Sequence, residues 1–248
     1  MTAGWTSSSP PVFFRRPENE PTDLCVPPRL ASWNAADHPD QIELAKALGH
    51  AADTLAPTLT GTTGPLALRL DVGLPATVGL LTEHDLDNYV YPLAAHLGRA
   101  GTPFVSVWCT KQHADTSFIR AELAIPTGSL PTDHTATVRT TASGSSTVYK
   151  KQIHDQLADA VQLPEGPLTL QLAYVVGRRR NWLNLWKPTI DALDRLLGRT
   201  RPGRDWHPLD GRITELGLHC RMDDSTGNDF LIAIAASSST ATQERTAM

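Results

Sequence analysis

The chain has 248 residues, of which 40% are hydrophobic and 19% charged, and its formal net charge is -4. This composition is typical of a globular protein with one large domain or two of ordinary size. No apolar run is long enough to span a membrane, so we expect no membrane association. The negative net charge excludes a protein that coats nucleic acid through its overall charge. The three cysteines lie far apart and indicate neither a disulfide framework nor a zinc knuckle, which suits a reducing cytoplasm.

Both ends of the chain are polar. Residues 1–22 and 237–248 are rich in Ser, Thr and Pro, and we predict disordered tails there. The start lacks the basic and apolar segments of a secretory signal. Residues 127–146 are rich in Ser, Thr and Gly and are predicted to join two halves, with a possible edge strand over 136–140.

Periodicity predicts the same series of elements in each half. The predicted elements of the first half are a helix over 40–55, a strand over 66–74, a helix after Asp87, and strands over 104–108 and 118–125. Those of the second half are a helix over 146–161, a strand over 168–176, a helix over 185–197, and strands over 213–218 and 230–235.

The order helix, strand, helix, strand, strand thus occurs twice, about 100 residues apart. The first strand of each set starts with Gly-Pro-Leu-x-Leu-x-Leu, at residues 64–70 and 166–172. A repeat of this length indicates a duplicated domain and not a solenoid. We predict an α/β (α+β) fold of two units, 23–128 and 129–236, each a mixed sheet with helices on one face. The units are expected to pair within one chain as a pseudo-dimer, so that the protein acts as a monomer.

An acidic pair precedes the second predicted helix of the first half. Proline is tolerated in the first helical turn, so Pro92 predicts a helix that begins near Asn88 and places Asp85 and Asp87 at the strand-to-helix junction. Carboxylates two residues apart in extended chain point to one side, and with a third from a neighbouring strand they provide oxygen ligands for Mg²⁺. The alternative is helix capping, which stabilises by about 1 kcal/mol.

The second half carries a predicted helix at 148–162, a predicted strand at 168–176 and an arginine run at 178–180. Two short motifs follow, at 184–193 and 209–213. In this order it resembles the RusA-like family of Holliday-junction resolvases. The family pattern is similar to Asp-Leu-Asp-Asn-Leu-x-Lys, then Asp-Ala-Leu, then an Asp-Asp pair ahead of a strand. The resemblance implies homodimers whose aspartates bind Mg²⁺ for phosphodiester hydrolysis, with the lysine close to the scissile phosphate.

Matched residue by residue, the family pattern is divided between the two halves. In the first half Asp85, Asp87 and Asn88 fit the acidic motif, but Tyr91 stands in the place of the lysine and no later aspartate is present. The second half has the complementary residues, since Lys187, Asp191 and Asp210 fit while Asn181 and Leu183 replace the two metal-binding aspartates. Neither half has a complete site.

Two hypotheses account for this division. In the first, the halves form one composite site in which Asp85, Asp87 and Asp210 bind Mg²⁺ and Lys187 takes part in catalysis. The protein would then be an endonuclease that resolves branched DNA. In the second, catalysis is lost and the chain is an inactive RusA-fold protein that binds DNA or another protein.

The basic residues of the second half predict where DNA would bind. Residues from 150 to 221 have an excess of Lys and Arg, whereas residues 1–128 have an acidic excess. Five arginines in two predicted loops are candidates for phosphate contacts: Arg178, Arg179, Arg180, Arg201 and Arg204. The alternative is solvated loop charge. We expect a cytoplasmic protein whose partner is branched or structured DNA.

Overall fold

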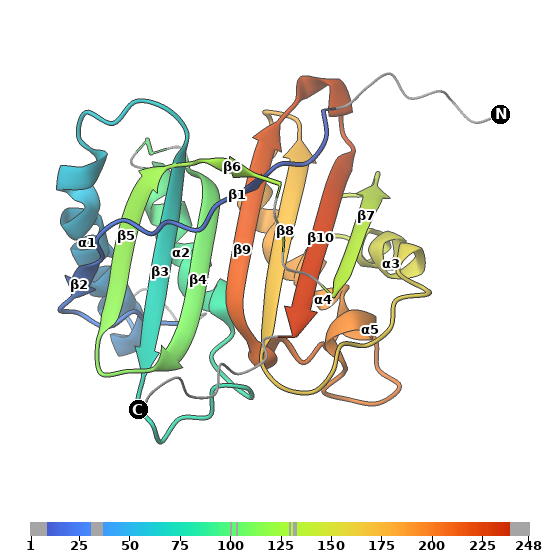
Figure 1. Cartoon of the computed structure of the whole chain (residues 1–248), viewed down its shortest axis with the longest axis horizontal. Helices are drawn as coiled ribbons and strands as arrows, with labels where there is room; N and C mark the ends of the chain where they lie inside the picture. Colours follow the sequence, from blue (N-terminus) through green and yellow to red (C-terminus); the bar gives the residue numbers. More distant parts are fainter. Residues whose placement is uncertain are drawn as a thin grey trace, which may run out of the picture.

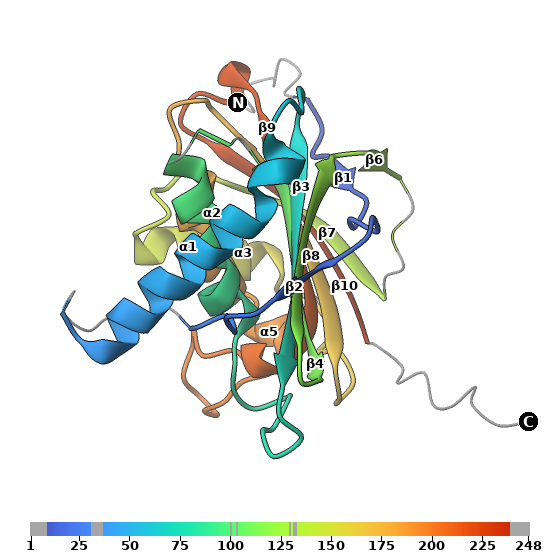
Figure 2. The same ribbon diagram turned by 90° about the vertical axis from the view of Figure 1, so that its left-hand side faces the viewer.

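A computed structural model describes residues 9–30, 37–99, 101–102, 104–128, 130 and 133–238. The fold is mixed α+β and is built on one eight-stranded mixed sheet. The helices cover one face of this sheet, and an N-terminal segment crosses the other face (Figures 1 and 2). Among the described residues, no helix combines the length and the apolar content needed to cross a membrane.

The first half contains two long helices and four strands of the main sheet. In chain order these are β2 (Thr22–Leu24), α1 (Pro39–Leu59), β3 (Leu66–Leu74), α2 (Leu86–Arg99), β4 (Phe104–His113) and β5 (Ser117–Leu123). Helix α1 begins at a proline, a position that costs no hydrogen bond, and it buries a stripe of apolar side chains at helical spacing: Leu44, Ala47, Ala51 and Leu55.

The second half repeats this order with shorter helices. Its elements are β7 (His134–Thr140), α3 (Thr147–Gln156), β8 (Leu168–Val176), the 3-10 helix η1 (Trp182–Leu185), α4 (Trp186–Asp191), α5 (Asp194–Leu197), the 3-10 helix η2 (Asp210–Arg212), β9 (Ile213–Met222), the 3-10 helix η3 (Asp224–Thr226) and β10 (Phe230–Ser238).

The predicted helix over 185–197 is wrong as one continuous helix. The chain breaks between α4 and α5, where the N–H groups of Ala192 and Leu193 bond to carbonyls three residues back in place of four. Asp194 then begins α5, and its buried carboxylate accepts a hydrogen bond from the backbone N–H of Trp206 and pairs with Arg199. The helical spacing of apolar residues over 185–197 does not indicate these partners of Asp194, and so it does not indicate the tight turn between α4 and α5.

The strands of the main sheet run in the order β2-β5-β3-β4-β9-β8-β10-β7. In the first half β3 is parallel to β4 and antiparallel to β5. In the second half β8 is parallel to β9 and antiparallel to β10. The outer strands β2 and β7 pair with β5 and β10, and the antiparallel pair β4–β9 joins the halves. The order of elements is therefore the same when it is read from either edge towards the centre.

The two parallel pairs also share an irregularity. Register shifts between Leu66 and Ala67 in β3, and between Leu168 and Thr169 in β8. Both shifts follow the Gly-Pro-Leu start of the strand, and both pair that leucine with the first residue of the next parallel strand. The matched sequence pattern thus corresponds to a matched backbone geometry.

One hydrophobic core lies between the sheet and the helices and spans both halves. Alternate leucines of β3 and β8 face it and are almost fully buried: Leu66, Leu68, Leu70, Leu168, Leu170 and Leu172. Complete burial of such a side chain stabilises the fold by about 1.5–3 kcal/mol.

The prediction of a disordered tail over 1–22 is wrong for residues 9–22. Phe13 and Phe14 form strand β1, which pairs with β6 (Pro126–Thr127), and Arg16 forms an ion pair with Glu215 at 2.9 Å. The two phenylalanine rings pack against His219 of β9, so apolar burial holds this segment on the sheet. At the other end, residues 237 and 238 belong to β10. The remaining residues of both predicted tails, 1–8 and 239–248, lie outside the described residues.

His219 generates a prediction about acid stability. It is fully buried, and burial lowers the pKa of its imidazole to about 3, while the unfolded chain retains the usual value near 6.5. Its contribution to stability is therefore complete above pH 6.5 and is lost as pH falls. We expect the free energy of unfolding to fall by about 1.4 kcal/mol per pH unit from this group between pH 6 and 4.

The measurement is denaturant unfolding across this pH range. His219→Asn should be less stable at pH 7 because it loses ring packing. Its free energy of unfolding should nevertheless change less with pH, because one fewer proton is taken up on unfolding. Parallel pH dependences of the two proteins would contradict a neutral buried His219.

Candidate functional site

The structure brings three of the predicted site carboxylates together. Oxygen atoms of Asp85, Asp87 and Asp210 all lie within 4.8 Å of one another. Asp85 and Asp87 flank the start of α2 in the first half, and Asp210 begins η2 immediately before β9 in the second half. We call these three residues the acidic cluster. It is composite, because it draws on both halves of the chain.

A buried lysine ties the two halves together beside the acidic cluster. Lys111, on β4, donates hydrogen bonds to the carbonyl oxygens of Glu83 at 2.9 Å, His84 at 3.1 Å and Gly211 at 2.6 Å. The first two carbonyls precede Asp85, and the third follows Asp210. One ammonium group therefore fixes the distance between the two chain segments that supply the acidic cluster.

The same contact requires a glycine. A Cβ atom at Gly211 would lie 2.9 Å from the carbonyl carbon of Thr82, closer than real Cβ contacts allow. The loop before Asp85 thus packs directly on the backbone of η2. His84, within this loop, adopts a φ of 63°, which is uncommon for a residue with a side chain, and its ring nitrogen hydrogen-bonds the Tyr89 hydroxyl at 2.5 Å.

Lys187 joins the acidic cluster from the start of α4. Its Nζ donates to Oδ2 of Asp210 at 2.6 Å and lies 3.3 Å from Oδ1 of Asp191, which also pairs with Lys150. Burial acts to lower the pKa of Lys187, but the carboxylates of Asp87 and Asp210 outweigh it and raise the pKa above its usual value. Lys187 is therefore a firmly charged cation within the cluster.

Asp87 is the most deeply buried carboxylate of the acidic cluster. Its side chain belongs to a residue only 4% exposed, and it forms no hydrogen bond or ion pair with any of the described residues. Burial raises its pKa to about 6, and Lys187 opposes this shift only in part. Burial likewise raises the pKa of Asp85, with Asp210 adding to the effect. The cluster thus concentrates negative charge that the protein does not fully neutralise.

These residues fit a divalent cation with a preference for oxygen ligands. Carboxylate oxygens are the ligands that Mg²⁺ takes in proteins, and an unpartnered buried carboxylate is stabilised by such an ion. A carboxylate has two oxygens, so Asp210 has one to offer while the other pairs with Lys187. Asp85, Asp87 and Asp210 are the residues that would hold the ion.

A second group of potential ligands is occupied by arginines. His154, Asp194 and Asp205 also approach within 4.8 Å of one another. Arg199 pairs with both carboxylates at 2.9 Å, and Arg195 donates to Nε2 of His154 at 2.8 Å. Protein cations therefore fill this position, and we assign it a structural role in the loop that follows α5.

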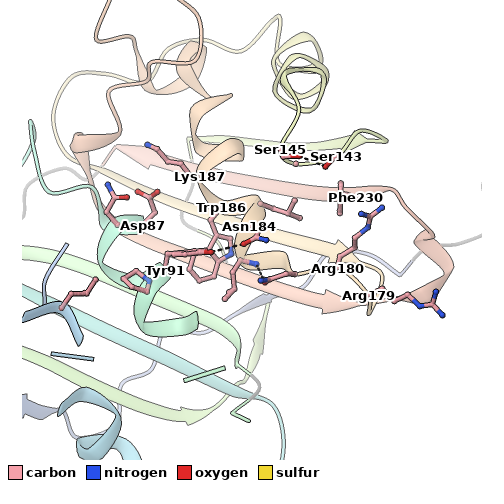
Figure 3. A pocket seen from close by; sticks show the side chains of 17 residues that line it. Asp87, Tyr91, Ser143, Ser145, Arg179, Arg180, Asn184, Trp186, Lys187 and Phe230 are labelled. Carbon is pink, nitrogen blue, oxygen red and sulfur yellow. Dashed lines mark hydrogen bonds between the residues drawn. The ribbon is translucent and has the colours of Figure 1, made fainter. Parts of the chain in front are cut away.

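A cavity of about 740 Å³ opens beside the acidic cluster. Asp87 and Lys187 lie at one end of it, and Arg179 and Arg180 lie at the other, as Figure 3 shows. Tyr91 and other polar and aromatic side chains line the space between these ends. The cavity thus connects a concentration of negative charge with a pair of cations.

The predicted nucleic-acid-binding arginines divide into three groups. Arg179 and Arg180 line the cavity, and Arg180 stacks over the Phe230 ring at 5.5 Å. Arg178 forms an ion pair with Asp224 at 3.2 Å. Arg201 and Arg204 lie in the loop after α5 and do not line the cavity. Of the two arginine loops, only the one after β8 therefore contributes to the cavity.

Sequence reasoning missed Lys111. The strand predicted over 104–108 ended before this residue, whereas β4 continues to His113. A lysine three residues beyond a run of apolar residues resembles a solvated strand end. Only the tertiary contact with Gly211 reveals that it is buried.

No protein-family model and no curated protein matches this chain. The functional argument therefore depends on the acidic cluster, Lys187 and the cavity.

Asp87→Asn should make the metal-free protein more stable at pH 7.5. Because the folded pKa of Asp87 is raised, its contribution to stability is complete below about pH 4 and is lost as pH rises through 6. We expect a gain on the order of 3 kcal/mol at neutral pH and little difference near pH 4. Denaturant unfolding in EDTA at both pH values measures this.

Mg²⁺ should narrow that difference. Millimolar Mg²⁺ should raise the melting temperature of the unmodified protein, since it binds the folded state only, and should leave Asp87→Asn unchanged. Asp115→Asn, an exposed change in the β4–β5 turn, is the control and should respond to Mg²⁺ normally. Equal stabilisation of Asp87→Asn would remove Asp87 from the metal ligands.

Lys111→Met should weaken the composite site without abolishing the fold. Methionine fills similar volume but leaves three carbonyls without their donor, which costs about 1–3 kcal/mol for such buried groups. We expect a lower melting temperature and at least tenfold weaker Mg²⁺ binding by titration calorimetry. Lys46→Met, on the exposed side of α1, should change neither quantity, and unchanged Mg²⁺ affinity in Lys111→Met would contradict the positioning role.

Proposed function

We propose that this chain is a duplicated, RusA-like, Mg²⁺-dependent endonuclease that acts on branched DNA, such as Holliday junctions, through one composite site. The observation that carries the proposal is the meeting of complementary motif halves. Asp85 and Asp87 come from one half and Asp210 from the other, yet their oxygens lie within 4.8 Å. Lys187 also reaches this cluster from the second half. A scaffold with no use for the site has no physical need to keep these like charges together.

Internal duplication is supported by the sheet. The strand order is the same from both edges, and the register shift follows the Gly-Pro-Leu pattern in both β3 and β8. On this proposal one chain supplies both halves of a pseudo-dimer, and the protein acts as a monomer. The helices that begin near Asn88 and Asn184 are then equivalent.

The residues have distinct tasks in hydrolysis. When bound, Mg²⁺ supplies Lewis-acid activation of the phosphate and a more acidic water. Asp85, Asp87 and Asp210 hold the ion, and Lys187 donates to the phosphate oxygens as negative charge develops on them. The water oxygen bonds to phosphorus, the phosphorus–oxygen bond to the leaving sugar breaks, and that oxygen takes up a proton while the water releases one to solvent.

The charge distribution favours DNA as the partner. The positively charged end of the cavity, at Arg179 and Arg180, suits a phosphate backbone that continues away from the acidic cluster. The free cysteines and the lack of a membrane-spanning helix among the described residues fit a cytoplasmic protein.

An inactive DNA-binding scaffold is the second candidate, and one contact favours it. Lys187 pairs with both Asp210 and Asp191, so the site is partly neutralised by its own lysine. In this alternative the acidic cluster and Lys187 form an ion-pair network that stabilises the contact between the halves, and no cleavage occurs.

Cleavage of labelled four-way DNA junctions in Mg²⁺ separates the two candidates. We expect incision by the unmodified protein, a loss of at least 100-fold in Asp87→Asn, and unchanged activity in the exposed control Asp115→Asn. Junction binding without incision would establish the inactive scaffold. If the protein neither binds nor cuts the junctions, both forms of the proposal are refuted.

A further inference from the structure

The fold contains a second place that corresponds to the acidic cluster. The first residue of β3 pairs with Phe104, the first residue of β4, and the first residue of β8 pairs with Ile213, the first residue of β9. Counting back three residues from each, Asp210 corresponds to Gly101. The motif alignment sets Asp85 and Asp87 against Asn181 and Leu183, and Lys187 against Tyr91.

This counterpart is assembled from both halves in the same crossed manner. Lys187 of the second half reaches the acidic cluster, and Tyr91 of the first half reaches the second-half motif, where its hydroxyl donates to Oδ1 of Asn184 at 3.1 Å. Tyr91 also packs edge-on against Trp186, with ring centroids 6.2 Å apart. The two places are therefore related by the repeated strand order, although their chemistry differs.

The counterpart has no carboxylate at any equivalent position. Asparagine, leucine and glycine replace the three aspartates. The side-chain oxygen of Asn181 accepts a hydrogen bond from the Leu183 N–H at 3.1 Å and so caps η1. Without anionic oxygen ligands this place does not hold Mg²⁺ in the manner of the acidic cluster.

The counterpart is nevertheless open to the cavity. Asn181, Leu183, Asn184 and Tyr91 all line the 740 Å³ cavity. Arg179 lines it as well, and it forms no hydrogen bond or ion pair with any of the described residues. Arg179 is exposed, and a guanidinium group that lines a cavity without a partner among the described residues is available to bind an anion.

The distribution of lining residues favours a polynucleotide strand over a small anion. Cations stand at both ends, Lys187 at one and Arg179 at the other, whereas Trp186 and Phe230 line the cavity between them. A strand presents phosphates at intervals and apolar faces of bases and sugars between them, and amide and hydroxyl groups bind base edges.

We propose that the counterpart end of this cavity, lined by Asn181, Leu183 and Arg179, binds a single nucleic-acid strand and does not cut it. The inference deepens the proposed function and rests on it in one respect: if the acidic cluster cleaves DNA, the molecule has one cleaving centre and one holding centre. Each bound junction then receives one incision, in the strand at the acidic cluster, while the counterpart end of the cavity retains another stretch of strand.

Strand binding is tested without cleavage, by fluorescence anisotropy of a labelled oligothymidylate in EDTA. We expect Arg179→Ala to weaken binding about tenfold and to reduce the dependence of log K on log salt by roughly one phosphate contact. Arg15→Ala, an exposed change on the segment that crosses the opposite face of the sheet, is the control. Absence of binding, or equal losses in both variants, would overturn the proposal.

The number of incisions is tested on a four-way junction that carries a different label on each strand. In a single turnover with protein in excess we expect one cut strand per junction, and paired cuts in the same junction would overturn the assignment of the cavity as a holding centre. Failure of the proposed nuclease has a different signature. In that case no strand is cut, yet the Arg179-dependent binding of oligothymidylate persists.

Discussion

The antiparallel pairing of β4 with β9 is the constraint on which the rest of the structure depends. It aligns Ser106 with His219 and Thr110 with Glu215, and so turns two four-stranded arrays into one sheet. Because Lys111 follows Thr110 along β4, this register also fixes the point from which its ammonium group reaches the backbone of Gly211. A shift by one residue would turn Lys111 to the other face of the sheet and separate the segments that carry Asp85 and Asp210.

The electrostatics of the composite site oppose the stability of the fold. Three carboxylates converge in a partly desolvated position, and burial raises the pKa of Asp87 to about 6. Lys187 and Lys111 offset part of this repulsion, one through ion pairs and the other through its charge and its backbone contacts. A structural capping role for Asp87 does not explain the geometry, because its carboxylate forms no hydrogen bond with a described backbone N–H group. A cation that binds the carboxylates would relieve the remaining repulsion, so these residues fit such an ion.

The parts of the structure that local patterns determine were predictable from sequence, and those that depend on tertiary contacts were not. The bounds of β3 and β8 were predicted in full, because Gly-Pro and alternating leucines mark a buried strand directly. The break between α4 and α5 depends on Asp194 and its distant partner Trp206, and the order of residues 9–22 depends on burial of Phe13 and Phe14 against His219. The composite site was a hypothesis from the divided motif. The short distances between its carboxylates depend on the pairing of β4 with β9, which the sequence did not reveal. The cavity had no linear signal, since its lining comes from segments dispersed along the chain, from α1 and α2 through the loop before α3, the loop after β8, η1 and α4 to β10.

The location of the divided motif changes how its missing residues are interpreted. In sequence, the first half lacks the lysine and the later aspartate, and the second lacks the two leading aspartates, which resembles independent decay of two sites. In space, the retained residues Asp85, Asp87, Lys187 and Asp210 meet at one place. Tyr91, Asn181 and Leu183, which replace these residues in the other copy of the motif, lie at the counterpart and line the cavity. Independent decay would leave both places partly equipped. Here Asp85, Asp87, Lys187 and Asp210 lie at one place and none of the equivalent residues at the other, as expected if one centre is maintained for chemistry while its counterpart is free to acquire a different surface.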